Sequence, residues 1–269
     1  MADVPLQASE GRTMASIGTI LDVRGLSVHF GGIRAVNGLS CTIKEGTITG
    51  LIGPNGSGKT TFINTITGMY APNAGQIVFR GENIAGMKPY QIARRGIGRT
   101  FQITRLFPQM TVLDNLLIAQ MHQKGESVWL GVIKPASVRS QESEILEKAL
   151  GFLEFVGLTR LKDELAGNLS YGQQKLLEIA RIMMIDPSVI LLDEPFAGVN
   201  PTNIERLLNL IVQLNAERGI TIVLVEHMMK IMMRLAQTII VMKAGALIAE
   251  GTPAEIQQNE AAIEAYLGA

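Results

Sequence analysis

Apolar and polar positions alternate with a period of two near the start of the chain and follow a helical repeat further along it. The alternation predicts a strand at residues 20–30, which Gly31-Gly32 ends, and then a strand pair at 38–43 and 47–52 that turns at Lys44-Glu45-Gly46. Further strands are predicted at 76–80, 97–101, 189–192, 220–225, 238–242 and 246–250, the last two forming a hairpin.

Apolar residues spaced three and four positions apart predict the helices. Thr111 and Asp114 have the spacing of a capping box, and Pro201 suits the first turn of a helix. Residues 1–19 show little period and are expected to form a flexible tail, while residues 121–138 are expected to form an insertion between helices. The helices are predicted at 60–69, 89–95, 111–123, 140–156, 172–185, from 201 onward, and at 227–236, 253–258 and 261–267.

Composition narrows the class of protein. The 269 residues hold 24 Lys and Arg against 24 Asp and Glu, and this balance argues against broad binding to nucleic acid or anionic membranes. Hydrophobic residues make up 47%, as in a globular chain of one or two domains, but no run approaches the ~20 apolar residues of a spanning helix. Cys41 is the only cysteine, which excludes an internal disulfide and a cysteine-based zinc site. The start lacks the pattern of a secretory signal.

The strongest chemical signal is a glycine-rich loop at residues 53–60, which matches G-x-x-x-x-G-K-[ST] between a predicted strand and a predicted helix. Its glycines let backbone N–H groups turn inward onto phosphate oxygens, and the helix start adds a favourable dipole. Lys59 is expected to reach the β- and γ-phosphates, and the Thr60 hydroxyl to face Mg²⁺. The order of strand, loop and helix favours this function over a plain glycine-rich turn. The predicted ATP-binding residues of the loop are Gly53, Asn55, Gly56, Ser57, Gly58, Lys59, Thr60 and Thr61.

A second signal is an acidic pair at the end of the buried strand predicted at 189–192. Ligand chemistry in open α/β sheets occurs at the carboxyl ends of strands. Asp193 therefore suits the Mg²⁺ shell, and Glu194 suits a general base that positions water. A solvated pair of acids at a strand end is the alternative, and the glycine-rich loop disfavours it.

The segment Leu169-Ser170-Tyr171-Gly172-Gln173-Gln174 enters a predicted helix between these two motifs. Ser170, the Gly172 backbone and the helix start together favour an anion. The segment resembles the signature sequence of ATP-binding cassette (ABC) ATPases, usually L-S-G-G-Q, and departs from it at Tyr171. The resemblance implies that Ser170, Gly172 and Gln173 contact the ATP held by another subunit, and that Tyr171 leaves this function intact.

Other residues match ABC markers in the order of the family. Gln102 matches the glutamine that contacts Mg²⁺ or water, and His227 matches the histidine at the γ-phosphate, so that Gln102, His227 and Lys59 join Glu194 in the implied catalytic set. Phe30 resembles the aromatic residue that stacks on adenine, although a core phenylalanine fits the position equally well. Asn200 replaces the common aspartate of the D-loop. The contacts of this residue with the other subunit are therefore expected to differ from those usual in the family, while hydrolysis itself is not affected.

Several segments are similar, within the ABC family, to the ATP-binding subunits of bacterial branched-chain amino-acid importers. They are residues 96–102, 105–107, 110–112, 169–172, 193–201, 250–253 and 265–268. Related subunits for urea, short amides or lipopolysaccharide export share parts of this pattern. The lipopolysaccharide type keeps the standard signature, so Tyr171 argues against it.

The resemblance covers residues 20–268 and implies the fold. It is an α/β P-loop NTPase cassette with a mostly parallel core sheet, an N-terminal antiparallel β-subdomain and an inserted α-helical subdomain. Residues 20–88 and 168–250 are then expected to form the core with its β-subdomain, residues 89–167 the helical subdomain, and residues 253–268 the C-terminal helices.

The implied function is ATP hydrolysis that energises transport of a small solute, such as branched-chain or other amino acids, through separate permease subunits. The implied cofactors are ATP and Mg²⁺, with Thr60, Gln102 and Asp193 at the metal. The implied partners are transmembrane permease subunits, a second ATPase subunit (identical or a sister chain) and a solute-binding protein, with no nucleic acid. The implied location is the cytoplasmic face of the inner (plasma) membrane.

An ATP-gated clamp acting on ribosomes or DNA is the alternative outside transport. Translation-type clamps carry two cassettes in one chain, whereas this sequence has one P-loop motif. DNA-type clamps separate the P-loop from the signature by a long coiled coil, but here Lys59 and Ser170 lie only 111 positions apart. Both comparisons favour transport.

Overall fold

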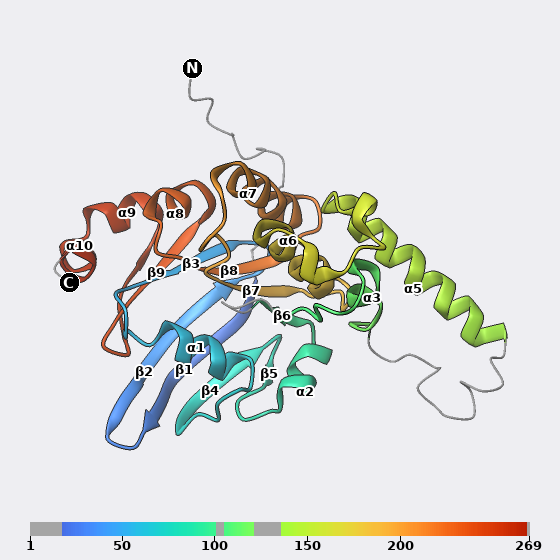
Figure 1. Ribbon diagram of the computed structural model, residues 1–269. Coiled ribbons are helices and arrows are strands. Elements are labelled where there is room, and N and C mark those ends of the chain that lie inside the picture. The colour runs from blue at the N-terminus through green and yellow to red at the C-terminus, as the bar shows by residue number, and fades with distance from the viewer. Residues whose placement is uncertain (1–17, 101–104, 121–135, 268–269) are drawn as a thin grey trace.

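The computed structural model describes residues 18–100, 105–120 and 136–267 (Figure 1). Its strands are β1 (Thr19–Phe30), β2 (Ile33–Lys44), β3 (Ile48–Ile52), β4 (Ala74–Phe79), β5 (Glu82–Asn83), β6 (Ile97–Arg99), β7 (Val189–Asp193), β8 (Thr221–Val225), β9 (Thr238–Lys243) and β10 (Ala246–Gly251). Its α-helices are α1 (Lys59–Ile66), α2 (Pro89–Arg94), α3 (Val112–Leu117), α5 (Ala136–Phe155), α6 (Tyr171–Met183), α7 (Pro201–Ala216), α8 (Met229–Leu235), α9 (Pro253–Gln258) and α10 (Glu260–Leu267). Two short 3-10 helices are η2 (Thr159–Leu161) and η3 (Ala166–Asn168).

The strands form two sheets. The larger has the order β10-β9-β3-β8-β7-β6, and the smaller has the order β2-β1-β4-β5. In the larger sheet β9, β3, β8, β7 and β6 run parallel, and β10 is an antiparallel edge strand. The smaller sheet is antiparallel. The mainly parallel sheet, the antiparallel sheet near the start of the chain and the helices confirm the predicted fold class.

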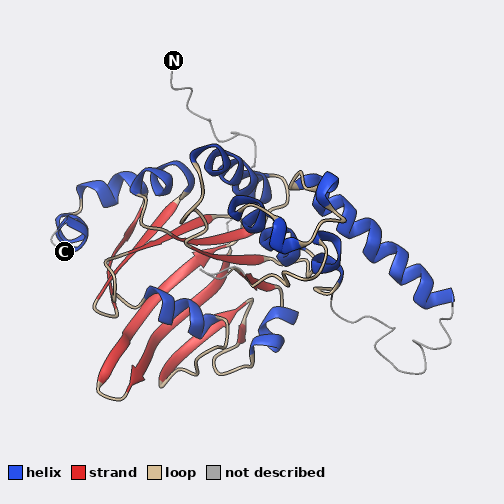
Figure 2. Cartoon of the chain, viewed as in Figure 1, coloured by secondary structure: helices blue, strands red, loops and turns tan. Residues whose placement is uncertain are grey.

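Helices cover both faces of the larger sheet (Figure 2). On one face, Phe62, Ile63 and Ile66 of α1 share a core with residues of both sheets. On the other face, α6, α7 and α8 pack with the helices α3 and α5. Because β3, β7 and β8 are buried along their whole length, their sequences are unbroken apolar runs, as expected for strands covered on two sides.

The strand pair predicted at residues 38–43 and 47–52 is wrong. β2 pairs with β1 across the Gly31-Gly32 turn, and β3 lies between β8 and β9 in the larger sheet. The turn at Lys44-Glu45-Gly46 therefore carries the chain from one sheet to the other. Burial gives the physical reason: β3 is buried on both faces, whereas the second half of β2 alternates between buried and exposed, so β3 needs an interior place in a sheet that is covered twice.

Helix ends differ from the sequence pattern by a few residues. α3 begins after Thr111, as predicted, and the Thr111 Oγ1 accepts the Asp114 N–H at 3.0 Å. It ends at Leu117 instead of residue 123. There the helical pattern gives way to a tighter turn, in which the Ala119 N–H donates to the carbonyl of Leu116, three residues back instead of four. The tail expected at 1–19 and the insertion expected at 121–138 fall mainly on residues 1–17 and 121–135, which lie outside the described residues.

None of the helices that the structure describes has the length and apolar character needed to cross a membrane. α5 is 20 residues long, which suffices for a bilayer in length alone. It carries charged side chains along that length, namely Arg139, Glu142, Glu144, Glu147, Lys148 and Glu154.

Gly98 sets how closely α6 approaches β6. A Cβ atom built on Gly98 would lie 2.3 Å from Cγ2 of Ile182. Gly98→Ala is therefore expected to lower the free energy of unfolding by about 1–3 kcal/mol through overpacking. Urea denaturation followed by circular dichroism measures the change.

Gly151→Ala is the matched control, because Gly151 lies in α5 with no atom within 4 Å of an added Cβ. This substitution is expected to raise the free energy of unfolding by up to about 1 kcal/mol, since Ala favours the helix. Equal effects of the two substitutions would contradict the packing argument.

Candidate active site

The loop between β3 and α1 runs against the backbone of two other strands. A Cβ atom on Gly53 would lie 2.1 Å from the Met242 carbonyl oxygen at the end of β9, and one on Gly58 would lie 2.2 Å from the Ala35 carbonyl oxygen in β2. Both glycines have positive φ, +153° and +101°. Only glycine fits these two positions, because any other residue would collide with backbone atoms and adopt a strained φ.

Helix α1 begins without a side-chain cap or an acidic residue in its first turn. Other helices of the chain have such a cap, supplied by Thr111, Ser170, Asn200 and Thr252. The first N–H groups of α1, from Lys59, Thr60 and Thr61, have no acceptor within the helix and lie at the positive end of its dipole. This is the arrangement that binds phosphate at a helix start.

The loop residues differ in their access to solvent. Gly53, Ser57 and Lys59 are buried, Gly58 and Thr61 are half-buried, and Asn55, Gly56 and Thr60 are exposed. The loop thus has an inner side that packs on the sheet and an outer side that an anion can reach.

The Lys59 ammonium group folds back over the loop. Its Nζ donates to the carbonyl oxygens of Gly53 at 2.8 Å and Pro54 at 3.0 Å, and lies 3.4 Å from Ser57 Oγ. Burial lowers the pKa of Lys59, and the nearby charges of Glu194 and Asp193 act in the opposite direction. A phosphate entering the loop would meet a cation that is already desolvated and held at the entrance.

β7 delivers the predicted acidic pair at its end. Asp193 is 4% exposed, and its Oδ2 accepts a bond of 2.9 Å from the Arg99 guanidinium in β6. Its N–H donates to Thr100 Oγ1 at 3.2 Å. The carboxylate is therefore fixed from the neighbouring parallel strand.

Glu194 and His227 touch directly, although they follow different strands. The Glu194 Oε1 lies 2.7 Å from the His227 Nε2. Glu194 has a left-handed backbone, with φ +48°, and its N–H donates to the Val225 carbonyl at the end of β8. The two side chains keep 19% and 40% exposure, respectively, so both remain accessible to water and substrate.

Arg99 is a site residue that the sequence analysis missed. Besides Asp193, its guanidinium donates to Asn64 Oδ1 at 2.5 Å and to Thr67 Oγ1 at 3.3 Å. Burial lowers the pKa of Arg99, while the hydrogen bond that it donates to Asp193 raises it. Arg99 thus joins α1, β6 and the Asp193 carboxylate. The feature of the sequence that could have indicated Arg99 is a charged residue at the end of a buried strand, next to a family motif.

Oxygen donors near the loop fit Mg²⁺. Among the described residues, no three His, Cys, Asp or Glu side chains gather into a cage for a metal. Mg²⁺ usually takes only one or two protein oxygens and completes its shell with water and substrate phosphates. The Thr60 hydroxyl at the start of α1 and the Asp193 carboxylate form such a sparse set.

The signature residues lie at the start of α6, with contacts of their own. Ser170 caps the helix reciprocally with Gln173: the Ser170 N–H donates to Gln173 Oε1 at 2.9 Å, and the Gln173 N–H donates to Ser170 Oγ at 3.4 Å. Gly172 is buried against Asn203 of α7, where an added Cβ would lie 2.6 Å from the amide nitrogen. The contact of Gly172 with Asn203 joins α6 to α7.

The two departures from the usual ABC pattern lie close together. The Tyr171 ring packs on Gly198 of the D-loop, 3.3 Å from where a Cβ would stand, and the Lys175 ammonium lies 5.5 Å from the ring centre. Asn200 caps α7 by accepting the Asn203 N–H at 2.9 Å. Tyr171 and Asn200 thus belong to one contact region between the signature helix and the D-loop.

Phe30 and Gln102 were also predicted to contact ATP or its Mg²⁺, and the structure describes only Phe30. Phe30 lies at the tip of the β1–β2 hairpin, 45% exposed, with its ring edge-on to Tyr70 at 5.1 Å. It is therefore not a core phenylalanine, and contact with adenine stays a prediction. Gln102 lies outside the described residues.

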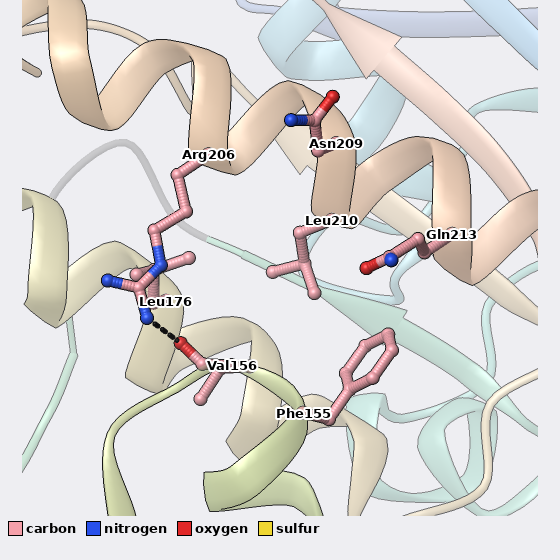
Figure 3. Close-up of a pocket in the computed structure, with 7 residues that line it drawn as sticks. All are labelled: Phe155, Val156, Leu176, Arg206, Asn209, Leu210 and Gln213. Carbon is pink, nitrogen blue, oxygen red and sulfur yellow. Dashed lines mark hydrogen bonds between the residues drawn. The ribbon is translucent and has the colours of Figure 1, made fainter.

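A cavity of about 310 Å³ opens between α5, α6 and α7 (Figure 3). Arg206 closes one side by donating to the Val156 and Gly157 carbonyls at 2.7 and 3.0 Å. The lining residues are Phe155, Val156, Leu176, Arg206, Asn209, Leu210 and Gln213. None of them is a predicted site residue, so the cavity is separate from the phosphate loop.

The buried Arg99–Asp193 pair makes a stability prediction. Both side chains are less than a tenth exposed. Arg99→Met is expected to lower the free energy of unfolding by about 3–5 kcal/mol, because it leaves Asp193 buried without its cation. Urea denaturation of the purified chain measures the loss.

Arg24→Met supplies the control, because Arg24 pairs with Asp22 on the surface at 2.6 Å. It is expected to leave the unfolding midpoint unchanged, since solvent screens an exposed pair. A loss at Arg24 as large as that at Arg99 would show that burial does not set the cost.

Two family profiles match the chain. That of the ABC transporter family covers residues 36–197. That of the branched-chain amino acid ATP-binding cassette transporter covers residues 246–269.

Curated relatives match over nearly the whole length. The high-affinity branched-chain amino acid transport ATP-binding protein BraF of Pseudomonas aeruginosa is 45% identical over 93% of this chain and 98% of its own. LivG of Escherichia coli, with the same description, is 44% identical over the same shares. A probable LivG of Methanocaldococcus jannaschii is 38% identical over 93% and 97%.

Solved structures agree with the fold. A nucleotide-free ATP-binding cassette from an ABC transporter has a TM-score of 0.81 and 36% identity, over 94% of this chain and all of its own. An ABC transporter cassette in its ADP conformation has a TM-score of 0.81 and 37% identity, over the same shares. A dimeric cassette bound to ADP and phosphate has a TM-score of 0.71 and 26% identity, over 87% and 98%. The chain is an ATP-binding cassette ATPase and belongs to the ABC transporter family.

Proposed function

We propose that this chain hydrolyses ATP to energise the uptake of branched-chain amino acids through separate membrane permease subunits. The observation that carries the hydrolytic part is the 2.7 Å contact between Glu194 and His227, beside a desolvated Lys59. The solute is supported by relatives at 44–45% identity that are described as branched-chain amino acid transport proteins. Urea, amide and lipopolysaccharide transport, or a clamp on ribosomes or DNA, are the alternatives.

The loop residues divide the work of binding ATP. We propose that the N–H groups of Asn55, Gly56 and Gly58 and of the first turn of α1 hold the phosphates, with Gly53 and Ser57 shaping the loop. Thr61 adds a further N–H donor. Lys59 would exchange its two carbonyl acceptors for β- and γ-phosphate oxygens, since ionised acceptors make the stronger bonds. Phe30 would stack on adenine from the hairpin tip.

Glu194 would act on the water that attacks the γ-phosphate. A general base must lie within hydrogen-bond reach of the proton that it takes, and the 19% exposure of Glu194 leaves that approach open. His227 would hold Glu194 through the 2.7 Å contact and face the γ-phosphate with its remaining exposed surface. Mg²⁺, held by Thr60, Asp193 and Gln102, would neutralise the charge that develops on the phosphates.

A second ATPase subunit would complete each site. The signature residues Ser170, Gly172 and Gln173 have contacts at α6 and α7 of their own chain, which suits a role toward a nucleotide held by the partner. A dimeric cassette among the similar solved structures supports this arrangement. The partner is a second copy or a sister ATPase.

The permease would dock in a groove of about 230 Å³ beside α2 and β6. Large apolar side chains are exposed near it, among them Met69, which lines it, and Phe107, whose ring lies 5.9 Å from the lining residue Arg181. Exposed apolar patches mark contacts between proteins. The groove is lined by Thr67, Met69, Pro89, Ile92, Ala93, Ile97, Gly98, Arg99, Ala119, Arg181, Ile182 and Ile185.

This docking fits the proposed domains and location. Residues 20–88 and 168–250 would form the core with its β-subdomain, residues 89–167 the helical subdomain and residues 253–268 the closing helices. The groove then lies where the two main parts meet. A permease seated there would hold the chain at the cytoplasmic face of the plasma membrane, with a solute-binding protein on the other side.

Glu194→Gln tests the hydrolytic role. The variant should bind ATP as the parent does, while turnover falls by about 100-fold or more, because the amide takes no proton from water. A phosphate-release assay and a fluorescent-nucleotide titration measure the two quantities. Glu205→Gln, which removes an exposed carboxylate paired with Arg234, should leave both unchanged. Near-normal turnover in Glu194→Gln would refute the assignment of the base.

Ala93→Asp tests the docking groove. A carboxylate at this half-buried lining position should cut uptake of labelled leucine by about 10-fold or more in cells that carry only the variant, since an unpaired charge is costly in a contact surface. Turnover of the isolated chain should stay within about 2-fold, because Ala93 lies on α2 and is not one of the residues proposed to bind ATP or act on it. Ala261→Asp, exposed on α10, is the control. Normal uptake in Ala93→Asp would place the permease elsewhere.

A further inference from the structure

Glu226 is a buried carboxylate outside the set of residues proposed to bind ATP or act on it. It follows β8 directly and precedes His227. Its exposure is only 3%. Acidic side chains are almost never buried to this extent unless other groups compensate the charge.

Both oxygens of Glu226 accept bonds from backbone N–H groups. Oε1 accepts the Phe196 N–H at 3.1 Å, and Oε2 accepts the His227 N–H at 3.1 Å. The pKa of Glu226 is raised, chiefly by burial, while the N–H groups of Phe196, His227 and Met228 act in the opposite direction and the charge of Glu194 adds to the rise. Backbone donors, and no side-chain cation among these contacts, therefore compensate the carboxylate.

The two N–H groups belong to different segments. Phe196 follows the left-handed turn at Glu194, and His227 follows β8. The turn has one further tie to β8, the bond from the Glu194 N–H to the Val225 carbonyl at 2.9 Å. A left-handed backbone at a residue other than glycine persists only where its surroundings hold it. Glu226 is part of those surroundings.

We propose that Glu226 is a positioning residue for ATP hydrolysis, whose carboxylate bridges the Phe196 and His227 N–H groups and so holds Glu194 and His227 at their contact distance. The inference rests on the proposed function, because it presumes that Glu194 and His227 act on ATP. In the described hydrogen bonds, the Glu226 carboxylate reaches backbone N–H groups and not the side-chain atoms of Glu194 or His227. It acts through the backbone on both sides of the contact.

The chemistry requires a carboxylate and not merely a polar side chain. Both partners are donors, and only a carboxylate offers an acceptor at each end of the same planar group. Glutamine has nearly the same shape but one oxygen, so its NH₂ group would face one of the two N–H groups, donor against donor. One of the two segments would then lose its tie.

Glu226→Gln in the full-length chain tests this. Turnover should fall by about 10–100-fold, because small displacements of reacting groups cost that much, while the KM for ATP stays close to that of the parent. Glu178→Gln is the matched control: Glu178 is a 1% exposed acid on α6, paired with Lys175 at 3.6 Å. Its loss should lower the thermal midpoint and leave turnover within about 2-fold.

A double variant separates positioning from general destabilisation. In the Glu194→Gln background, Glu226→Gln should reduce turnover by less than about 2-fold further, because residues that act as a unit are not additive. Should Glu226→Gln fail to fold, Glu226→Asp keeps both oxygens and shortens the reach by one methylene. It should fold and show the same loss of turnover at an unchanged KM.

The results separate the positioning role of Glu226 from the proposed hydrolysis of ATP. Three results would overturn the role of Glu226 alone, provided that Glu194→Gln still loses its turnover. They are full turnover in Glu226→Gln, a raised KM with unchanged turnover in that variant, and a full additive loss in the double variant. Normal turnover in Glu194→Gln overturns the proposed function itself. The bridge is supported if Glu226→Gln lowers turnover, Glu178→Gln does not, and the double variant is no slower than Glu194→Gln alone by more than about 2-fold.

Discussion

The parallel direction of five strands is the constraint on which the site depends. Parallel strands end at the same edge of a sheet, and each end here supplies a different component. β3 leads into the phosphate loop, β7 ends at Asp193 and is followed by Glu194, and β8 is followed by Glu226 and His227. β9 contributes the backbone against which Gly53 packs. No single segment could provide this set, because the components come from positions nearly two hundred residues apart.

Desolvated charge is the second shared property. Lys59, Asp193 and Glu226 are nearly inaccessible to water, and each is compensated by a different partner: carbonyl oxygens, the Arg99 guanidinium and backbone N–H groups. Fixed dipoles and ion pairs need no rearrangement when charge develops on a bound phosphate, whereas water must reorient. Glu194 and His227, in contrast, retain exposure, as groups that meet substrate and water must.

Local motifs were predictable from sequence, and long-range contacts were not. The loop at Gly53–Lys59, the acidic pair at the end of β7 and the fold class followed from residues adjacent in the chain or from a family resemblance carried by them. The partner of β3 did not follow, because burial on two faces outweighed the turn signal at Lys44–Gly46. Arg99 and Glu226 were missed for a related reason. A charged residue at a strand end acquires meaning only when the neighbouring strand is known.

Tyr171 and Gly198 restrict how this chain can be recombined with its relatives. The ring packs on a glycine whose φ is +71°, and Gly172 packs beside it on Asn203. A side chain at position 198 would crowd the ring, and a smaller residue at position 171 would leave the glycine uncovered. A change at one position without a matching change at the other would therefore disturb the contact between the signature helix and the D-loop, so crossovers that keep residues 171 and 198 together preserve it.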